Sequence, residues 1–311
     1  MITLDDVTKN FDEVVAVSRL TARLKANSVT GLLGPNGAGK STTLKLIMGE
    51  IKPSSGTIRV MGENPFDNYR IKQKIGYVSE YLDIYPWMAG RKLVQSLARL
   101  HMPREEASKA AAAALKMVGL NEEAVDRPTG SYSKGMKQRL KVAAAILHEP
   151  ELLILDEPFG GLDPLGRREM KQLIKRLNDT AGVTILISSH ILYEIEEMST
   201  HMILIHRGQT IAEGKPAKII EIIDAYPHSI LFRGKQETLK RLAQELLEEE
   251  IVQTVNVLEP DNNSSQLDVI TEKPSVFYKA VTRIVAENNI KIDHMESKTD
   301  NIEAIFEYLT Q

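Results

Sequence analysis

The sequence predicts an α/β core followed by a smaller α+β domain. A glycine-rich loop joins a β-prone run, Val29-Thr30-Gly31-Leu32-Leu33, to a helix-like run that Gly49 closes. Unbroken apolar runs at 152–155, 184–187 and 202–205 are typical of a parallel sheet that is covered on both faces. The 311 residues also exceed the ~250–300 that a single hydrophobic core commonly holds, so we expect two domains.

Before residue 85, short strands are expected around the glycine-rich loop and its helix, and they include an antiparallel β subdomain. These strands are predicted at Ile2–Leu4, Val29–Leu33, Thr57–Val60 and Ile75–Val78. From about 85 to 150 the pattern is helical, because Pro103 with Glu105 and Glu106 is typical of a helix start and Gly119 of its end. Strands return after 150, so a helical subdomain interrupts the mostly parallel core.

Beyond Pro227 the character of the chain changes, and a C-terminal accessory domain is expected at 226–311, after a first domain at 1–225. Its strands are predicted at 230–232, 252–258, 266–271 and 290–295, and its helices at 237–249, 276–287 and 302–309. Before the closing helix the order is β-α-β-β-α-β, which is the ferredoxin-like arrangement. The sequence leaves open whether this domain regulates the first one, dimerises or braces it.

The composition excludes several classes of function. The formal net charge of −3 argues against nucleic acid as an obligatory partner. There is no cysteine, so disulfides and thiolate metal sites are excluded. No apolar run approaches the ~20 residues of a membrane span, and the N-terminus lacks the features of a signal peptide. We expect a protein that is soluble by itself and acts at a membrane only through another polypeptide.

The glycine-rich loop is a complete phosphate-binding motif. The residues Gly34-Pro35-Asn36-Gly37-Ala38-Gly39-Lys40-Ser41-Thr42 match G-x-x-x-x-G-K-[ST] at every fixed position. Its glycines let backbone N–H groups turn toward a phosphate, and the N-terminus of the following helix adds positive potential. Lys40 can reach the β- and γ-phosphates, and the Ser41 hydroxyl can ligate Mg²⁺. The whole loop is therefore predicted to bind a nucleoside triphosphate.

Two acids follow the apolar run Leu152-Leu153-Ile154-Leu155. Asp156 stands at the carboxyl end of the predicted strand, where it can hold Mg²⁺ directly or through water. Glu157 can orient a water molecule in line with the γ-phosphate and accept its proton. This pair predicts hydrolysis of the bound triphosphate.

The segment Ser131-Tyr132-Ser133-Lys134-Gly135-Met136-Lys137-Gln138-Arg139 precedes this strand. By itself it is typical of a surface turn that opens a basic helix. In this place it resembles the signature motif of ABC ATPases, and the resemblance extends over residues 1 to about 225. The loop at 34–42 then resembles Walker A, Asp156 the acid of Walker B, Gly161-Leu162-Asp163 the D-loop, and Ser188-Ser189-His190 the segment of the switch histidine.

The resemblance implies roles for residues that carry no clear chemistry by themselves. In ABC ATPases two subunits pack head to tail, and each ATP lies between one Walker A and the other subunit's signature. Ser133 and Gly135 would then contact the γ-phosphate of the opposite subunit's ATP. His190 would join Lys40 and Glu157 as a catalytic residue, by donating a hydrogen bond to the γ-phosphate or the attacking water. Phe11 would stack on adenine.

Three features depart from the family pattern. In the signature, Lys134 replaces a glycine and Met136 a glutamine, and the extra cation either lies near the γ-phosphate or points to solvent. Glu80 stands where the family has a glutamine in the Q-loop, and its carboxylate is still a hard oxygen ligand for Mg²⁺. The D-loop begins with Gly160-Gly161. None of these removes a residue on which hydrolysis depends.

Aromatic residues gather after Glu80, in Tyr81-Leu82-Asp83-Ile84-Tyr85-Pro86-Trp87-Met88. They either anchor the start of the helical subdomain or form a docking cleft for a partner. The resemblance implies an ATPase that dimerises around two Mg-ATP, as a homodimer or with a paired ATPase subunit. It also implies a separate transmembrane permease subunit, through which the cytoplasmic chain sits on the inner face of the cell membrane.

The signature Tyr132 to Met136, Glu80 and the extra domain resemble a branch of exporters that handle drugs, antibiotics or lipids. Two alternatives are open. A non-transport ABC ATPase would act on nucleic acid or ribosomes, but such proteins usually carry two cassettes, a long coiled-coil insertion or zinc ligands. A regulatory module would bind ATP without turning it over, and the presence of Glu157 and His190 argues against it.

Overall fold

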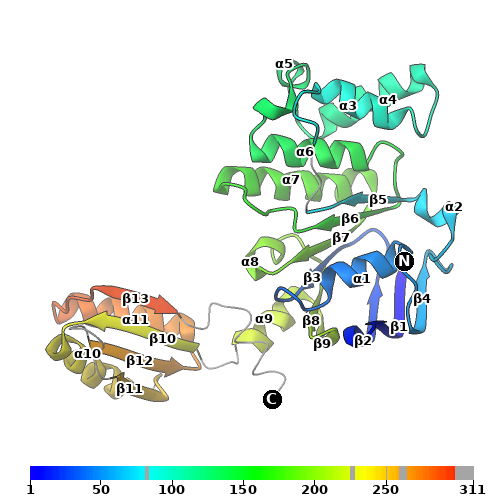
Figure 1. The fold of residues 1–311 in the computed structure, drawn as a ribbon. Coiled ribbons are helices and arrows are strands. Elements are labelled where there is room, and N and C mark those ends of the chain that lie inside the picture. The colour runs from blue at the N-terminus through cyan, green and yellow to red at the C-terminus, as the bar shows by residue number, and fades with distance from the viewer. Residues whose placement is uncertain (81–83, 225–227, 250, 259–264, 298–311) are drawn as a thin grey trace. The chain divides into compact units, whose positions relative to one another are not determined.

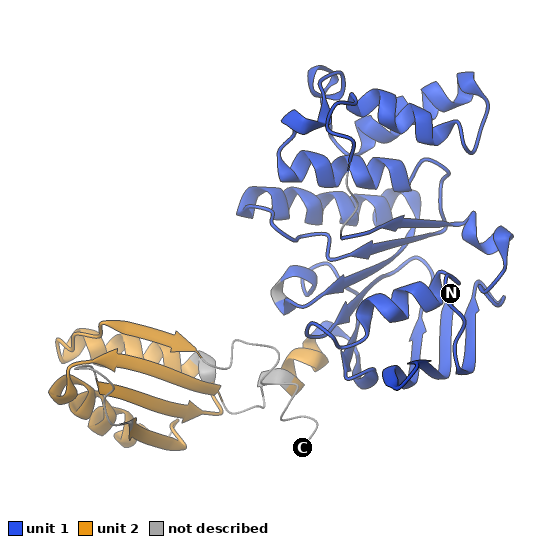
Figure 2. Cartoon of the chain, in the orientation of Figure 1, with its two compact units in different colours: residues 1–216 blue, residues 217–311 orange. Residues whose placement is uncertain are grey.

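The computed structural model describes residues 1–80, 84–224, 228–249, 251–258 and 265–297. The chain forms two compact units, at 1–216 and 217–311 (Figure 2). The boundary predicted from the sequence, at 225/226, lies C-terminal to this division, and the functional boundary stays a prediction. The predicted helix at 302–309 lies outside the described residues.

The first unit contains a six-stranded sheet in the order β5-β6-β7-β3-β8-β9 (Figure 1). Its strands are β3 Val29–Leu33, β5 Ile75–Val78, β6 Leu152–Asp156, β7 Thr184–Ser189, β8 His201–His206 and β9 Gln209–Gly214. All neighbours pair in parallel except β8 and β9. The mostly parallel sheet that the apolar runs predicted is confirmed.

A second sheet in this unit has three antiparallel strands in the order β2-β1-β4, from β1 Ile2–Phe11, β2 Val14–Leu24 and β4 Ser55–Val60. The sequence prediction ended the first strand at Leu4 and missed β2. Register shifts interrupt the pairing of β1 beyond Leu4, and β2 begins with two exposed valines. Irregular pairing and exposed apolar residues both weaken the alternation by which strands are recognised.

The unit has a helix after the phosphate loop and several helices within the stretch of about 85–150 that the sequence pattern marked as helical, whereas the helices that follow β4, β6 and β7 were not predicted. The helices of the unit are α1 Lys40–Ile47, α2 Tyr69–Lys72, α3 Gly90–Ala98, α4 Arg104–Met117, α5 Glu122–Val125, α6 Lys134–Ala145, α7 Pro164–Ala181 and α8 Leu192–Ile195, with a 3₁₀ turn η1 at Thr129–Ser131. In Figure 1, α3 to α6 lie at the end of the unit opposite the three-stranded sheet. The predicted start and end of α4 agree with its cap residues, Pro103 and Val118, the latter followed by Gly119.

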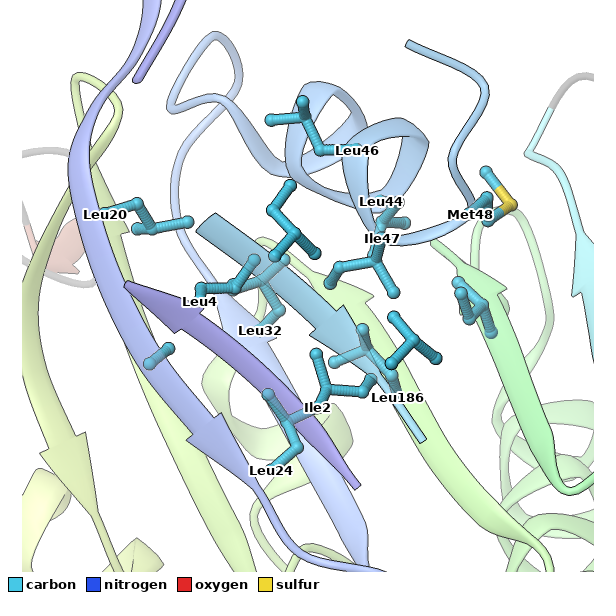
Figure 3. Close-up of a cluster of buried hydrophobic side chains, with 14 of the residues drawn as sticks. Ile2, Leu4, Leu20, Leu24, Leu32, Leu44, Leu46, Ile47, Met48 and Leu186 are labelled. Atoms are coloured by element: carbon cyan, nitrogen blue, oxygen red, sulfur yellow. The ribbon is translucent and has the colours of Figure 1, made fainter. Parts of the chain in front are cut away.

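An apolar cluster fixes α1 between the two sheets (Figure 3). Leu44 and Ile47 of α1 are fully buried together with Ile2 of β1, Leu32 of β3 and Leu186 of β7. Each such side chain contributes roughly 1.5–3 kcal/mol when it leaves water. Because the last three residues of the phosphate loop, Lys40 to Thr42, form the first turn of α1, this packing also holds the loop in place.

The second unit has the element order β10-α10-β11-β12-α11-β13, preceded by α9 Pro216–Asp224. Its elements are β10 His228–Gly234, α10 Gln236–Glu248, β11 Thr254–Leu258, β12 Ser265–Thr271, α11 Pro274–Glu287 and β13 His294–Ser297. The strands pair antiparallel in the order β11-β12-β10-β13, as expected for the ferredoxin-like arrangement. Phe232 and Phe277 lie at the centre of its apolar core.

Among the described residues, no helix has both the length and the apolar composition that crossing a bilayer requires.

Candidate functional site

The phosphate loop joins the end of β3 to the start of α1, as predicted. Gly39 is the N-cap residue of α1 and has φ +97°, a left-handed conformation that favours glycine. A Cβ on Gly39 would lie 2.5 Å from the carbonyl oxygen of Ala16, so any side chain would collide with β2. The loop therefore needs glycine here both for its turn and for its close approach to the neighbouring strand.

The loop forms one wall of a cavity of about 280 Å³. The described lining residues are Val14, Val15, Ala16, Pro35, Asn36, Gly37, Gly39, Lys40, Ser41, Thr42, Glu80 and Glu157. Half of these residues have polar or charged side chains, and seven of the twelve belong to the phosphate loop, which suits a phosphate-bearing ligand. The sequence did not single out Val14, Val15 and Ala16, because their strand was missed.

Lys40 and Glu157 line this cavity, and His190 contacts Glu157. Lys40 Nζ lies 3.3 Å from Glu157 Oε1, and both side chains are almost fully buried. His190 Nδ1 lies 2.9 Å from Glu157 Oε2. Lys40 Nζ also donates to the carbonyl oxygens of Gly34 (2.7 Å) and Pro35 (3.1 Å). The three side chains predicted to be catalytic thus form one contiguous cluster around the Glu157 carboxylate.

Sheet register explains why these residues meet. Asp156 pairs with Ser188 in the β6–β7 ladder, and Leu33 pairs with Ser189 in the β3–β7 ladder. The residues that follow, Glu157 and His190, therefore leave the sheet at the same edge as the phosphate loop. Parallel strands bring their carboxyl ends to one edge, where ligands of α/β proteins bind.

Ser188 orients both acids, a role that sequence reasoning missed. Its hydroxyl donates to Asp156 Oδ1 at 2.5 Å and accepts from the backbone N–H of Glu157 at 3.0 Å. Glu157 has φ +47°, which is uncommon for a residue with a side chain. The hydrogen bond that the Glu157 N–H donates to Ser188 Oγ helps to hold the turn after β6 in this conformation.

Ser41 and Asp156, predicted to bind magnesium, are brought together. Ser41 Oγ donates to Asp156 Oδ2 at 3.3 Å, although 115 residues separate them. A hydroxyl and a carboxylate are hard oxygen ligands, and Mg²⁺ commonly takes only one or two protein ligands beside substrate phosphates. Within the described part of the chain, no cluster of three or more His, Asp and Glu could hold a metal alone. The residues fit a magnesium ion shared with a nucleotide.

Glu80 lines the same cavity, and its backbone is attached to α6. Lys141 Nζ, on α6, donates to the carbonyl oxygens of Glu80 (3.2 Å) and Ser79 (3.4 Å). This lysine was not singled out from the sequence. It links the Glu80 segment to the helix that carries the signature motif.

Ser133 and Gly135 lie at the start of α6, apart from the residues that line the cavity. Ser133 is the N-cap of α6, and its hydroxyl accepts from the backbone N–H of Met136 at 3.2 Å. Lys134 is exposed and lies over the D-loop, since a Cβ on Gly161 would come within 3.0 Å of Lys134 Nζ. The exposed N-terminus of α6 has the chemistry of an anion site, and the contact of Ser133 and Gly135 with a nucleotide stays a prediction.

Phe11 lies at the tip of the β1–β2 hairpin, where it pairs with Val14. Phe11 is 46% exposed, and the ammonium nitrogen of Lys9 lies 4.8 Å from the centroid of its ring. The same hairpin contributes Val14 to the cavity wall. Stacking of Phe11 on adenine stays a prediction.

The aromatic segment after Glu80 is described from Ile84 onward. Tyr85 and Trp87 are 56% and 72% exposed, with ring centroids 5.6 Å apart. The backbone beneath them is bonded to η1: Thr129 Oγ1 donates to the Tyr85 carbonyl at 2.6 Å, and Gly130 N donates to the Pro86 carbonyl at 2.8 Å. The segment is thus attached to the residues just before Ser133, while its rings face solvent.

Comparisons with known proteins agree with this geometry. The ABC transporter family matches residues 17–160. The bacitracin transport ATP-binding protein BcrA of Bacillus licheniformis is 42% identical over 214 residues, which span 68% of this chain and 69% of that protein. The linearmycin resistance ATP-binding protein LnrL of Bacillus subtilis is 37% identical over 216 residues, which span 69% of each chain.

Solved structures give the same result for the fold. The dimeric structure of MJ0796, a bacterial ABC transporter cassette, has a TM-score of 0.63 and 27% identity, and the match covers 70% of this chain and 99% of that one. A dimeric post-hydrolysis state of the same cassette, bound to ADP and phosphate, also has a TM-score of 0.63. The chain therefore belongs to the ABC transporter family, as an ATP-binding protein.

Proposed function

We propose that this ABC ATPase closes with a second ATPase subunit around two Mg-ATP and drives export through a separate transmembrane permease subunit. The observation that carries the proposal is the contact of Glu157 with both Lys40 and His190 beside the phosphate loop. A base, a phosphate-binding cation and a switch residue meet at one point.

In the proposed mechanism Glu157 is the general base and is released by nucleotide binding. Here Lys40 is 3.3 Å from its carboxylate. The β- and γ-phosphates carry more negative charge than one carboxylate, so they compete for the Lys40 ammonium. Glu157 Oε1, which has no hydrogen-bond partner among the described residues, is then available to a water molecule. His190 remains beside it to bind the γ-phosphate.

Ser41 and Asp156, with Glu80 from the lining of the same cavity, would hold Mg²⁺. When bound, the ion would neutralise charge on the phosphate oxygens during transfer to water. The protein's part is to fix the oxygens, and Ser188 does so for Asp156 through its hydroxyl.

The second half of each site is proposed to come from Ser133 and Gly135 of the other subunit. Two observations support this. Both residues lie at the exposed start of α6 rather than at the cavity of their own chain, and the similar MJ0796 cassette is dimeric. The second subunit is either another copy of this chain or a paired ATPase.

Export is proposed from the named relatives, a bacitracin transport protein and a linearmycin resistance protein. The substrate class would be antibiotics or similar drugs or lipids. The exposed Tyr85 and Trp87 are proposed to dock the permease on the cytoplasmic face of the membrane, since large aromatic side chains dominate interface energetics. Functionally, we propose an ATPase domain at 1–225 and an accessory domain at 226–311.

The experiment that tests this proposal measures Mg-ATP-dependent dimerisation of the Glu157→Gln chain by light scattering. The variant should bind ATP without hydrolysing it and remain a dimer. Adding Ser133→Arg should abolish the dimer, because a long cation would fill the γ-phosphate contact. Adding Ser96→Arg, an exposed serine on α3, is the matched control and should leave the dimer intact. A dimer that survives Ser133→Arg would contradict the composite site.

The direction of transport needs a test in the host cell. Deleting this protein from its host should lower the concentration of a peptide antibiotic that stops growth. Supplying the Glu157→Gln variant should not bring that concentration back to the wild-type value. Full restoration by that variant would contradict ATP-driven export.

A further inference from the structure

Glu194 is a buried carboxyl group that the mechanism above does not use. It lies on α8, four residues after His190, and is only 6% exposed. Burial raises the pKa of its carboxyl above the ordinary range, while the Ser189 hydroxyl and the Arg167 guanidinium oppose the shift. An acid is costly to bury, so contacts that compensate for its burial are informative.

One of those contacts reaches the backbone around His190 through the Ser189 hydroxyl. Ser189 Oγ donates to Glu194 Oε2 at 2.9 Å. The same Ser189 oxygen accepts from the backbone N–H of Ile191 at 3.0 Å. Ser189 and Ile191 are the two chain neighbours of His190, so the Glu194 carboxylate orients a hydroxyl that bridges the backbone around His190.

The other oxygen of Glu194 faces α7. Its Oε1 lies 3.6 Å from Nη1 of Arg167, in the first turn of the helix that follows the D-loop. Arg167 N donates to the carbonyl of Asp163, the N-cap residue of that helix. A chain of contacts therefore connects the D-loop helix through Arg167, Glu194 and Ser189 to the backbone of His190.

We propose that Glu194 is a positioning residue for His190, which it holds against Glu157 by bridging the Ser189 hydroxyl and Arg167. The inference rests on the role proposed above for His190. The His190 side chain is 46% exposed, so packing around the imidazole does not fix its position. Its position therefore depends on the backbone on either side of His190. Without Glu194 the Ser189 hydroxyl turns to its other acceptor, the Ile191 carbonyl at 3.3 Å, and the segment loosens.

The test is a double-mutant cycle on ATP turnover by the full chain. Glu194→Ala should lower kcat about 10- to 100-fold, the cost of a misplaced catalytic group, with the KM for ATP unchanged within about twofold. Glu194→Gln keeps an acceptor for Ser189 and should recover most of the activity. In a His190→Ala background, Glu194→Ala should cost less than about twofold, since the group that it positions is absent.

Glu197→Gln is the matched control. Glu197 is exposed and is ion-paired to Lys171 of the same helix α7 at 3.0 Å, but it is not bonded to Ser189. Turnover should stay at the wild-type value. The melting temperature of each variant is measured to confirm that it is folded.

The outcomes distinguish a failure of the role proposed for His190 from a failure of the role proposed for Glu194. If His190→Ala alone kept wild-type turnover, the proposed role of His190 would be wrong, and this inference with it. If His190→Ala is impaired but Glu194→Ala costs the same in both backgrounds, only the Glu194 inference is overturned. Should turnover of His190→Ala be too low to compare, the ring proton NMR signal of His190 decides. It should move in Glu194→Ala and not in Glu197→Gln, and an unmoved signal in Glu194→Ala overturns the inference.

Discussion

The two compact units are both built from a sheet and helices and both bury an apolar core, but among the described residues the buried Lys, Asp and Glu side chains all lie in the first unit. In the first unit, buried polar side chains gather where strands end: Lys40, Asp156, Ser188, Ser189 and Glu194. In the second unit, α10 and α11 enclose apolar side chains such as Phe232, Phe277 and Leu242. The first unit therefore combines an apolar core with a polar site, whereas α10 and α11 of the second unit cover an apolar core.

Strand direction accounts for this difference. In the first unit β3, β6 and β7 are parallel, so the segments that leave their carboxyl ends converge at one edge. In the second unit every described pairing is antiparallel, so neighbouring strands end at opposite edges. In open α/β sheets ligands bind where several strands end together, and the parallel strands of the first unit supply such an edge.

The largest effect is expected from a comparison of substitutions at the two ends of β6 in the first unit. Glu157→Gln, after the carboxyl end of β6, should lower kcat about 10²- to 10⁴-fold, the usual contribution of a general base. Glu151→Gln, just before β6 and ion-paired to Lys74 on the surface, should leave kcat unchanged. Steady-state ATPase assays measure both. Equal losses would mean that strand direction does not decide where the chemistry lies.

The next effect concerns the second unit. Phe232→Ala removes a fully buried ring that packs on Phe277 with centroids 6.3 Å apart. It should destabilise the second unit by about 3–5 kcal/mol, measured by chemical denaturation, with kcat of the folded protein unaffected. A parallel loss of kcat under native conditions would show that the second unit also serves the catalytic site.

The smallest effect is a pH dependence in the first unit. Burial lowers the pKa of His148, which contacts the Ile75 carbonyl at 3.1 Å and stacks on His101. Below about pH 6.5 the unfolded chain protonates this histidine while the folded chain keeps it neutral, so stability is lost as the pH falls through that window.

Between pH 7.5 and 5.5 the wild-type melting temperature should therefore fall more than that of His148→Gln. The glutamine amide can still donate to Ile75. Identical falls in the two proteins would contradict the assigned burial effect.

Much of the site could be read from local sequence because its parts are local. The phosphate loop, the two acids after an apolar run and the helix cap at Ser133 each need only a few consecutive residues. The parts that were missed act over longer distances. Val14 to Ala16 reach the cavity through a hairpin with irregular register, and Lys141 reaches Glu80 across 61 residues.

By itself, the sequence determined five strands of the parallel sheet, the order of strands and helices from β10 to β13, and the identity of the phosphate loop, because periodicity, turns and glycine requirements are properties of short segments. The tertiary structure decided which of the polar residues meet. Lys40, Glu157 and His190 come together only because β3, β6 and β7 run in parallel and end in register. The link from Arg167 to Ser189 through Glu194 also arises from packing. Side-chain contacts between distant segments depend on register and burial, which no short stretch of sequence specifies.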